Sequence, residues 1–305
     1  MTTLTKPTDD LPPAARGSIG SVSAARKLKD RIVQVLVYVA FGLAVVPLVS
    51  VLWTVLTNGL GRLDGTFLQF SMNGVGGRDE GGGAYHAILG TLEQVAITSL
   101  IAVPIAVLTA VYLVEYGGNS RLARAVSFFV DVMTGIPSIV AGLFVLALWL
   151  LTFGFTYSGF AGSLALTILM IPTVVRATEE MLKLVPNDLR EASYALGVPR
   201  WRTVCFVVLP TALTGIITGV MLAVARVMGE TAPLLLTIFF TKAINTNPFE
   251  GPQAALPTFI WEQAGDPNQA SIDRAWTGAL VLILLIMLFN LGARLVARVF
   301  RPVSR

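Results

Sequence analysis

Two residues of opposite charge lie four positions apart in an apolar part of the chain. Arg226 and Glu230 are the only charged residues of the segment VMLAVARVMGETAPLLLTIFF. A charge near the centre of a bilayer costs about 2.5 to 3.5 kcal/mol on insertion scales, so a pair in one span needs an explanation. On a helix this spacing places both side chains on one face, where they can neutralise each other as a structural ion pair. The alternative is that Arg226 awaits an anion that crosses the membrane, while Glu230 holds the guanidinium in place.

The composition of the chain places this pair in a membrane protein. Of the 305 residues, 54% are hydrophobic and 13% are charged, and the mean hydropathy is +0.74. These values lie far outside the range of soluble globular domains. A single cysteine excludes an internal disulfide, and with one histidine the sequence has no Cys/His cluster for haem, iron–sulfur or zinc. The positive-inside rule is sufficient to account for the net charge of +4, so we expect no nucleic-acid partner.

Six segments are long and apolar enough to cross a hydrocarbon core of about 30 Å as helices of about 20 residues. We therefore predict an all-α fold, a polytopic membrane protein with six transmembrane helices in contact with lipid. The approximate bounds are 32–57, 88–114, 125–153, 160–177, 204–240 and 276–299. Residues 1–30 are rich in Pro, Ser and Thr, which predicts a disordered cytoplasmic tail. The first span is too long for a signal peptide, so we expect residues 31–57 to remain as a membrane anchor.

Lys and Arg are distributed unevenly between the segments that connect these spans. Segments rich in positive charge alternate along the chain, and residues 176–202 alone carry five of the 22 Lys and Arg residues. Under the positive-inside rule, this pattern places both termini and residues 176–202 in the cytoplasm. The outer segments are then residues 58–87 and 241–273. A run of glycines at 81–83 predicts flexibility in the first, and ALPTFIWEQA predicts a short interfacial helix in the second.

The main cytoplasmic loop has the pattern of a short amphipathic helix. Asn187 or Asp188 can cap a helix that runs to Leu196, and Gly197 can end it in a left-handed conformation. Its apolar face consists of Leu189, Ala192, Ala195 and Leu196. One interpretation is that this helix lies on the lipid surface; the other is that it binds a cytoplasmic protein.

The same loop contains a spaced pattern: Glu191, Ala192 and Ser193, then Gly197 four residues on, then Val-Val-Leu-Pro at 207–210. This pattern resembles the EAA loop of the permease subunits of type I ATP-binding-cassette importers, with Ser193 in place of the commoner and equally small Ala. The resemblance implies a permease core of five helices at residues 88–300. It also implies that the loop at 179–204 couples this core to a cytoplasmic ATPase, into which the short helix docks.

Two further segments are GIPSIVAGLFV at 135–145 and ARVMGETAPLLLT at 225–237. Both resemble the phosphate-specific permeases of that family. The resemblance implies that Arg226, Glu230 and Thr231 form a substrate site or gate for inorganic phosphate. Its chemistry is reasonable, because a planar guanidinium can donate two parallel hydrogen bonds to an oxyanion. Glu230 then keeps the guanidinium paired when no phosphate is present.

Prolines and glycines in the spans predict bends. Pro137 removes a backbone hydrogen bond and is expected to bend the third span. Gly229 and Pro233 bracket Glu230, which predicts an interrupted helix at the site. An ordinary kink filled by a neighbouring helix is the alternative.

Other polar residues near the span ends have less specific roles. Glu93 and Asp131 either line the pathway or reach water by snorkelling. His86 is expected to be a solvated loop residue. Three glutamates are expected to be cytoplasmic caps or loop charges: Glu115, Glu179 and Glu180.

The resemblance implies an importer of inorganic phosphate in the bacterial inner membrane that works by alternating access. A second, homologous permease would complete the pathway as a heterodimer, and an extracytoplasmic phosphate-binding protein would deliver the substrate. Two cytoplasmic ATPase subunits would bind ATP and Mg. The sequence has no G-x-x-x-x-G-K-[ST] pattern, so we expect this chain to be non-catalytic and to bind no cofactor of its own.

Three other classes of protein remain open. A permease for another oxyanion, sulfate or molybdate, would share most of these features. A secondary anion transporter or channel would account for Arg226 but not for the loop at 188–210. A membrane-embedded enzyme would need a cluster of His, Asp or Cys near one interface, and the sequence offers none.

Overall fold

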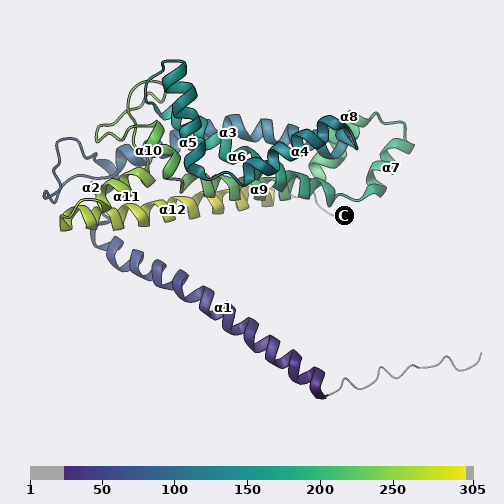
Figure 1. The fold of residues 1–305 in the computed structure, drawn as a ribbon, viewed down its shortest axis with the longest axis horizontal. Helices are drawn as coiled ribbons and strands as arrows, with labels where there is room; N and C mark the ends of the chain where they lie inside the picture. The colour runs from purple at the N-terminus through teal and green to yellow at the C-terminus, as the bar shows by residue number, and fades with distance from the viewer. Residues whose placement is uncertain (1–23, 300–305) are drawn as a thin grey trace, which may run out of the picture. The chain divides into compact units, whose positions relative to one another are not determined.

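Helices make up the described part of the chain. The computed structural model describes residues 24–299, and within them the secondary structure consists of helices and loops, with no strands (Figure 1). The chain divides into two compact units, Met1–Trp53 and Thr54–Arg305, which we describe separately. The predicted all-α fold is confirmed.

The described part of the first unit belongs to a single helix. Helix α1 spans Ala24–Gly59, and its most apolar window has a mean hydropathy of 2.6, as expected for a helix that contacts lipid. The predicted disordered tail covers residues 1–30. Residues 1–23 lie outside the described residues, whereas residues 24–30 form the start of α1, because Ala, Lys, Arg and Leu favour a helix there.

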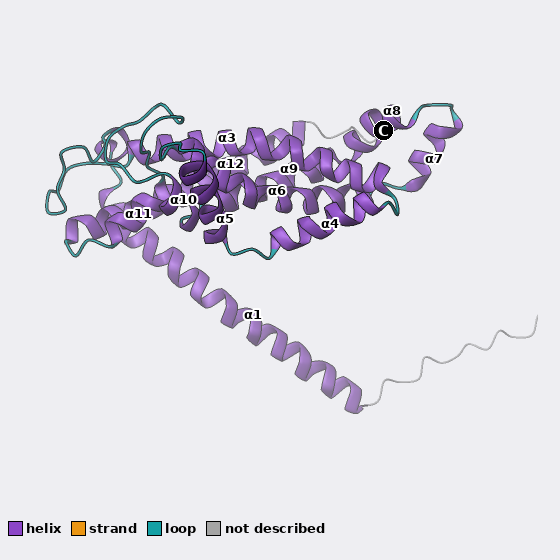
Figure 2. Cartoon of the chain, turned by 45° about the horizontal axis from the view of Figure 1, so that its top comes forward, coloured by secondary structure: helices purple, strands orange, loops and turns teal. Residues whose placement is uncertain are grey.

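Four long helices form the bundle of the second unit. They run side by side in Figure 2 and are α3 (Tyr85–Val111), α6 (Gly159–Lys183), α9 (Leu209–Met228) and α12 (Gln269–Val299). Helix α6 contacts both α3 and α9. One face of α3 consists of small, fully buried residues one turn apart, namely Ala102, Ala106 and Ala110. Small residues let helix backbones approach closely in a membrane, where packing rather than exclusion of water holds helices together.

The third predicted span is broken into two helices. The chain bends by 106° between α4 (Arg121–Thr134) and the segment Ser138–Thr152, which begins with α5 (Ser138–Val145), so α5 turns across the direction of α4 in Figure 1. Pro137 stands at the break in an extended conformation, which confirms the predicted bend. Five single helices of the described residues are long and apolar enough to cross a membrane, and counting the bent pair as one span gives six.

The fifth predicted span, 204–240, is also interrupted. Helix α9 ends at Met228, and a short helix α10 (Ala232–Thr237) follows after a break. Gly229 caps the end of α9, and Pro233 lies in the first turn of α10, where a missing N–H costs little. The predicted interruption around Glu230 is therefore confirmed.

Short elements lie at the two ends of the bundle. At one end are α7 (Asn187–Ala195) and α8 (Arg200–Thr203), and at the opposite end are α2 (Gly65–Gln69) and α11 (Leu256–Ala264) (Figure 1). Helix α11 confirms the predicted short helix. The remaining short elements are a 3₁₀ turn, η1 (Leu60–Arg62), and three π-helical turns, η2 (Tyr112–Gly117), η3 (Leu146–Thr152) and η4 (Val204–Val208).

A buried arginine organises the loop that precedes α3. Arg274 of α12 is 0% exposed, and its guanidinium donates hydrogen bonds to four backbone carbonyls of this loop. The acceptors are Gly76, Gly77, Asp79 and Gly81. The glycine run at 81–83 had predicted flexibility; instead, the loop is tied to α12, because a cation far away in the sequence satisfies its carbonyls.

His86 was predicted to be a solvated loop residue, and this prediction was wrong. The side chain is buried at the start of α3, with its ring edge-to-face with Phe240 and Phe259 at centroid distances of 6.0 and 5.7 Å. The phenylalanines come from the segment after α10 and from α11, which the sequence could not place against α3.

Candidate functional site

Arg226 and Glu230 lie at the break between α9 and α10. Arg226 is in the last turn of α9, and its Nε atom is 3.9 Å from Oε1 of Glu230. Glu230 itself lies beyond the end of the helix. Tight backbone hydrogen bonds, from the N–H of Glu230 to the carbonyl of Val227 and from Gly229 to Arg226, fold the chain so that the pair still meets. The sequence predicted the pairing correctly, although the two residues do not share one regular helix.

The two members of the pair differ in exposure. The Arg226 side chain is 61% exposed, whereas that of Glu230 is 18% exposed. Within the described part of the chain, Glu230 is the one charged partner of Arg226, at a distance close to the limit for an ion pair. A guanidinium exposed to this extent inside a span would face hydrocarbon unless a water-filled passage or another subunit covers it. The geometry therefore fits an arginine that binds a ligand or subunit outside this chain better than it fits a purely structural ion pair.

Thr231 and the two predicted breakers complete the site. Thr231 is the N-cap residue of α10, is half-buried, and makes no capping hydrogen bond with its hydroxyl. Gly229 and Pro233 bracket Glu230 as predicted. The structure thus brings Arg226, Glu230 and Thr231 together at one helix break.

Close contact between α5 and α10 supports the break from one side. A Cβ atom at Gly142 of α5 would lie 2.7 Å from the Cα of Pro233, so only glycine fits there. Gly142 belongs to the segment 135–145 and Pro233 to the segment 225–237. The two segments that carry the resemblance to phosphate-specific permeases are therefore packed against each other.

Asp131 has a structural partner in this chain. Arg176 of α6 forms ion pairs with Asp131 of α4 and with Glu179, and it also donates hydrogen bonds to Ser127. Glu179 is buried, so its prediction as a loop charge was wrong, whereas Glu180 is exposed as predicted. This cluster joins the second half of α4 to α6, before the bend at Pro137.

Glu93 also has a partner. Its Oε2 atom accepts a hydrogen bond of 2.6 Å from Nε2 of Gln253, in the segment before α11. Gln253 in turn accepts a hydrogen bond of 2.9 Å from the buried Gln94. Glu93 therefore joins α3 to that segment.

The predicted amphipathic helix of the cytoplasmic loop is present as α7. It begins at Asn187 and ends at Ala195, with Pro186 as the N-cap in place of the predicted Asn187 or Asp188. Asp188 lies in the first turn, where its charge complements the helix dipole. Gly197 has φ +74°, which confirms the predicted left-handed position.

The face that α7 presents is uncovered in this chain. All four predicted apolar residues are exposed: Leu189, Ala192, Ala195 and Leu196. Glu191 is exposed as well, whereas Ser193 is buried and its hydroxyl lies 2.8 Å from that of Thr203. Ser193 therefore packs inward, while Glu191 and Ala192 remain available to a partner.

Sequence reasoning missed the burial of Glu115. We predicted a cytoplasmic cap or loop charge, yet Glu115 is 4% exposed and forms an ion pair of 2.7 Å with Arg190 of α7. The two residues are 75 positions apart. No local pattern in the sequence connects them.

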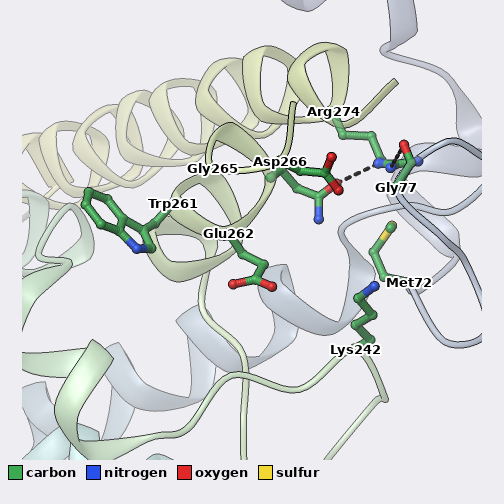
Figure 3. A pocket seen from close by; sticks show the side chains of 9 residues that line it. Met72, Gly77, Lys242, Trp261, Glu262, Gly265, Asp266 and Arg274 are labelled. Carbon is green, nitrogen blue, oxygen red and sulfur yellow. Dashed lines mark hydrogen bonds between the residues drawn. The ribbon is translucent and has the colours of Figure 1, made fainter. Parts of the chain in front are cut away.

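A polar pocket of about 280 Å³ lies near α11 (Figure 3). Charges of both signs line it, including Lys242, Glu262, Asp266 and Arg274. Hydrogen bonds from Asn268, first of all from its backbone N–H, hold the pKa of Asp266 below its ordinary value of 3.8. The sequence did not predict this pocket, because its walls come from three separate segments.

The chain matches a family model over most of its predicted core. The model is that of the "binding-protein-dependent transport system inner membrane component", and it matches residues 102–304. Phosphate transport system permease protein PstA 1 of Mycobacterium tuberculosis is 45% identical over 272 residues, which cover 89% of this chain and 89% of that protein. PstA of Pasteurella multocida is 39% identical over 270 residues, which cover 88% and 95%.

Solved transporters share the fold. A chain of the MetNI methionine ABC transporter in an inward-facing conformation aligns with a TM-score of 0.56 at 22% identity, over 72% of this chain and 94% of that one. A chain of a bacterial alginate ABC transporter aligns with a TM-score of 0.61 at 14% identity, over 87% and 94%. With several apolar helices and these relatives, the chain is a multi-pass inner membrane protein with the type I ABC importer permease fold. It belongs to the family of binding-protein-dependent transport system inner membrane components and, within it, has phosphate transport system permeases as relatives.

Proposed function

We propose that this chain is a permease subunit of an ATP-driven importer of inorganic phosphate, with Arg226 as its main contact to the substrate. The observation that carries the proposal is the exposed guanidinium of Arg226 at an interrupted span. Phosphate is proposed as the substrate because the relatives named above are phosphate transport permeases.

The proposed mechanism follows from the donors at the break. Phosphate carries one to two negative charges, and a guanidinium can bind two of its oxygens at once. Glu230 holds Arg226 when the site is empty, and its weak contact at 3.9 Å yields to the incoming anion. Thr231 adds a neutral hydroxyl beside the charged pair. The competition between Glu230 and the anion for Arg226 allows the anion to leave, because an arginine without a competing carboxylate would bind the anion too tightly.

Other subunits supply the remaining functions. A second, homologous permease covers the exposed side of Arg226 and completes the pathway as a heterodimer. Two cytoplasmic ATPase subunits bind ATP and Mg and contact α7 through Glu191, Ala192 and the apolar face, with Gly197 ending the docking helix. An extracytoplasmic phosphate-binding protein delivers the substrate at the end with α2 and α11. Both termini then face the cytoplasm, and this chain is non-catalytic and holds no cofactor.

Uptake of labelled phosphate by the reconstituted complex tests the proposal. Losing a charge-assisted contact costs up to about 3 kcal/mol, so Arg226→Ala is expected to lower ATP-dependent uptake about 100-fold while the complex still assembles. Arg294→Ala, which removes an exposed arginine of α12, is the matched control and is expected to transport normally.

Two outcomes would contradict the proposal. Normal uptake by Arg226→Ala would exclude Arg226 from the site. Uptake of labelled sulfate or molybdate in preference to phosphate by the unmodified complex would assign the permease to another oxyanion.

A further inference from the structure

Arg190 of α7 and Glu115 of η2 form a largely buried, bidentate ion pair. The Nη2 atom of Arg190 lies 2.7 Å from Oε1 of Glu115, and its Nε lies 3.2 and 3.4 Å from the two carboxylate oxygens. The side chains are 13% and 4% exposed, respectively. Paired donors on a planar group fix the orientation of the two side chains as well as their distance.

The same guanidinium also binds the end of α6. Its Nη1 donates to the carbonyl of Val185 at 2.6 Å, and its Nη2 donates to that of Leu182 at 3.0 Å. Val185 lies just beyond α6 and Leu182 lies in its last turn, where a cation suits the helix dipole. Arg190 therefore joins three elements: α7, the end of α6 and the extension of α3.

The position of Glu115 is unfavourable without this partner. Glu115 lies in η2, which continues α3 at its C-terminal end, where the helix dipole disfavours a negative charge. Burial adds a desolvation cost to the same carboxylate. A glutamate at this place is therefore best explained by the pairing with Arg190.

Two neighbouring contacts strengthen the junction. The guanidinium of Arg200 in α8 lies 5.2 Å from the centre of the Tyr116 ring, which is also in η2. The hydroxyls of Ser193 in α7 and Thr203 in α8 are buried and 2.8 Å apart. Helix α8 continues through η4 into α9. The loop is thus attached to η2 at two points and to α9 through the chain itself.

Helix α7 is joined to α6 and α9 through the backbone, but it is joined to α3 through side-chain contacts. The loop that carries α7 is the chain between α6 and α9, so a push on α7 reaches those two helices through the backbone. Helix α3 and its extension η2 lie far earlier in the sequence, and they are attached to α7 through Arg190 and Glu115, which are 75 positions apart. We propose that Arg190 and Glu115 are positioning residues that make α7 move together with α3, so that closure of the ATPase subunits is transmitted to α3 as well. This inference rests on the proposed docking of an ATPase subunit at α7.

The experiment measures phosphate transported per ATP hydrolysed by the complete complex in proteoliposomes, with the binding protein present. The variants are Glu115→Gln, Arg190→Gln and the double variant, and Arg121→Gln is the matched control, an exposed arginine at the start of α4. The single variants are expected to keep the ATPase subunits bound, because the exposed face of α7 is unchanged. We expect their transport per ATP to fall about tenfold, a typical size for the coupling between two sites.

The double variant separates coupling from folding. A single change leaves one charge buried and unpaired, whereas the double change leaves none. If the Arg190–Glu115 pair makes α7 move together with α3, the double variant assembles at least as well as the single variants, yet its transport per ATP stays low. Recovery of the wild-type ratio in the double variant would reduce the pair to a folding element and overturn the proposal.

The remaining outcomes are equally decisive. A wild-type ratio in Glu115→Gln would also overturn the proposal. If a single variant fails to assemble, the ratio is read from the double variant. Failure of the unmodified complex to transport phosphate would refute only the proposed substrate. The link between α7 and α3 would then be tested by measuring how far the binding protein of the complex stimulates ATP hydrolysis. We expect Glu115→Gln to abolish this stimulation.

Discussion

Two arginines of this chain, Arg226 and Arg274, meet their surroundings in opposite ways. Arg274 is 0% exposed and donates to four backbone carbonyls, to Gln263 and to Ser271. Arg226 is 61% exposed and has one distant carboxylate as its charged partner within residues 24–299. A cation whose donors are all used by its own chain holds the fold together. One that leaves its donors available can bind a substrate or another subunit, which is the role proposed for Arg226.

The largest expected difference is in stability. Arg274→Met leaves several buried carbonyls without donors, each at about 1–3 kcal/mol, so we expect a total loss of roughly 3 kcal/mol or more. For a domain of this size that corresponds to a melting temperature about 6–12 °C lower, measured in detergent or nanodiscs. Arg226→Met serves as the matched variant and is expected to melt like the wild type. Equal melting temperatures for all three proteins would break the comparison.

A smaller effect is expected from keeping the charge of Arg226 and changing its shape. Lysine offers a point charge in place of two parallel donors, so Arg226→Lys is expected to lose one hydrogen bond to phosphate. That corresponds to an uptake rate about tenfold lower, between the wild type and Arg226→Ala. Uptake by Arg226→Lys equal to that of the wild type would show that charge alone is sufficient.

Glu230 is expected to compete with the substrate for Arg226. An ion pair at 3.9 Å with one largely exposed member contributes about 0–1 kcal/mol, so Glu230→Gln is expected to lower the KM for phosphate by up to about fivefold. We also expect a lower kcat, because the anion is released more slowly. Steady-state uptake at varied phosphate concentration separates the two constants, and a raised KM would contradict the competing role.

The smallest effect is expected at Asp266, close to Arg274. Its pKa is lowered in the folded state, so the stabilisation is present above its ordinary value of 3.8 and is lost as the pH falls through the lower folded pKa. The melting temperature of Asp266→Asn is therefore expected to be slightly below that of the wild type at pH 7, and the two are expected to converge in strong acid. A large difference at pH 7 would mean that Arg274 depends on this carboxylate rather than on neutral carbonyls.

Local patterns in the sequence predicted a substantial part of the fold and of the site. Hydropathy located the spans, and breakers located the interruptions at Pro137 and at Gly229 to Pro233. The α7 helix and the left-handed Gly197 also followed from nearby residues. Hydropathy alone gave 204–240 as one apolar stretch, because a hydropathy window does not register that an apolar chain leaves the helix and resumes it a few residues later; the breakers Gly229 and Pro233 supplied the interruption.

Contacts between distant segments were beyond this reasoning. Glu115 and Arg190 are 75 positions apart, and Arg274 is 193 or more positions from the loop carbonyls that it binds. His86 and the loop at 81–83 were misjudged for the same reason, whereas Glu179 pairs with Arg176 only three positions away. A charged or glycine-rich segment was taken to be solvated because its covering partner lies elsewhere in the chain.

The contact between Gly142 and Pro233 limits movement at the break beside Arg226. Because the backbone of α10 rests directly on that of α5, the break beside Arg226 cannot widen or narrow by bending one helix alone. A methyl group added at position 142 would collide with the backbone of Pro233, and it would therefore force α5 and α10 apart at the break without removing any charge.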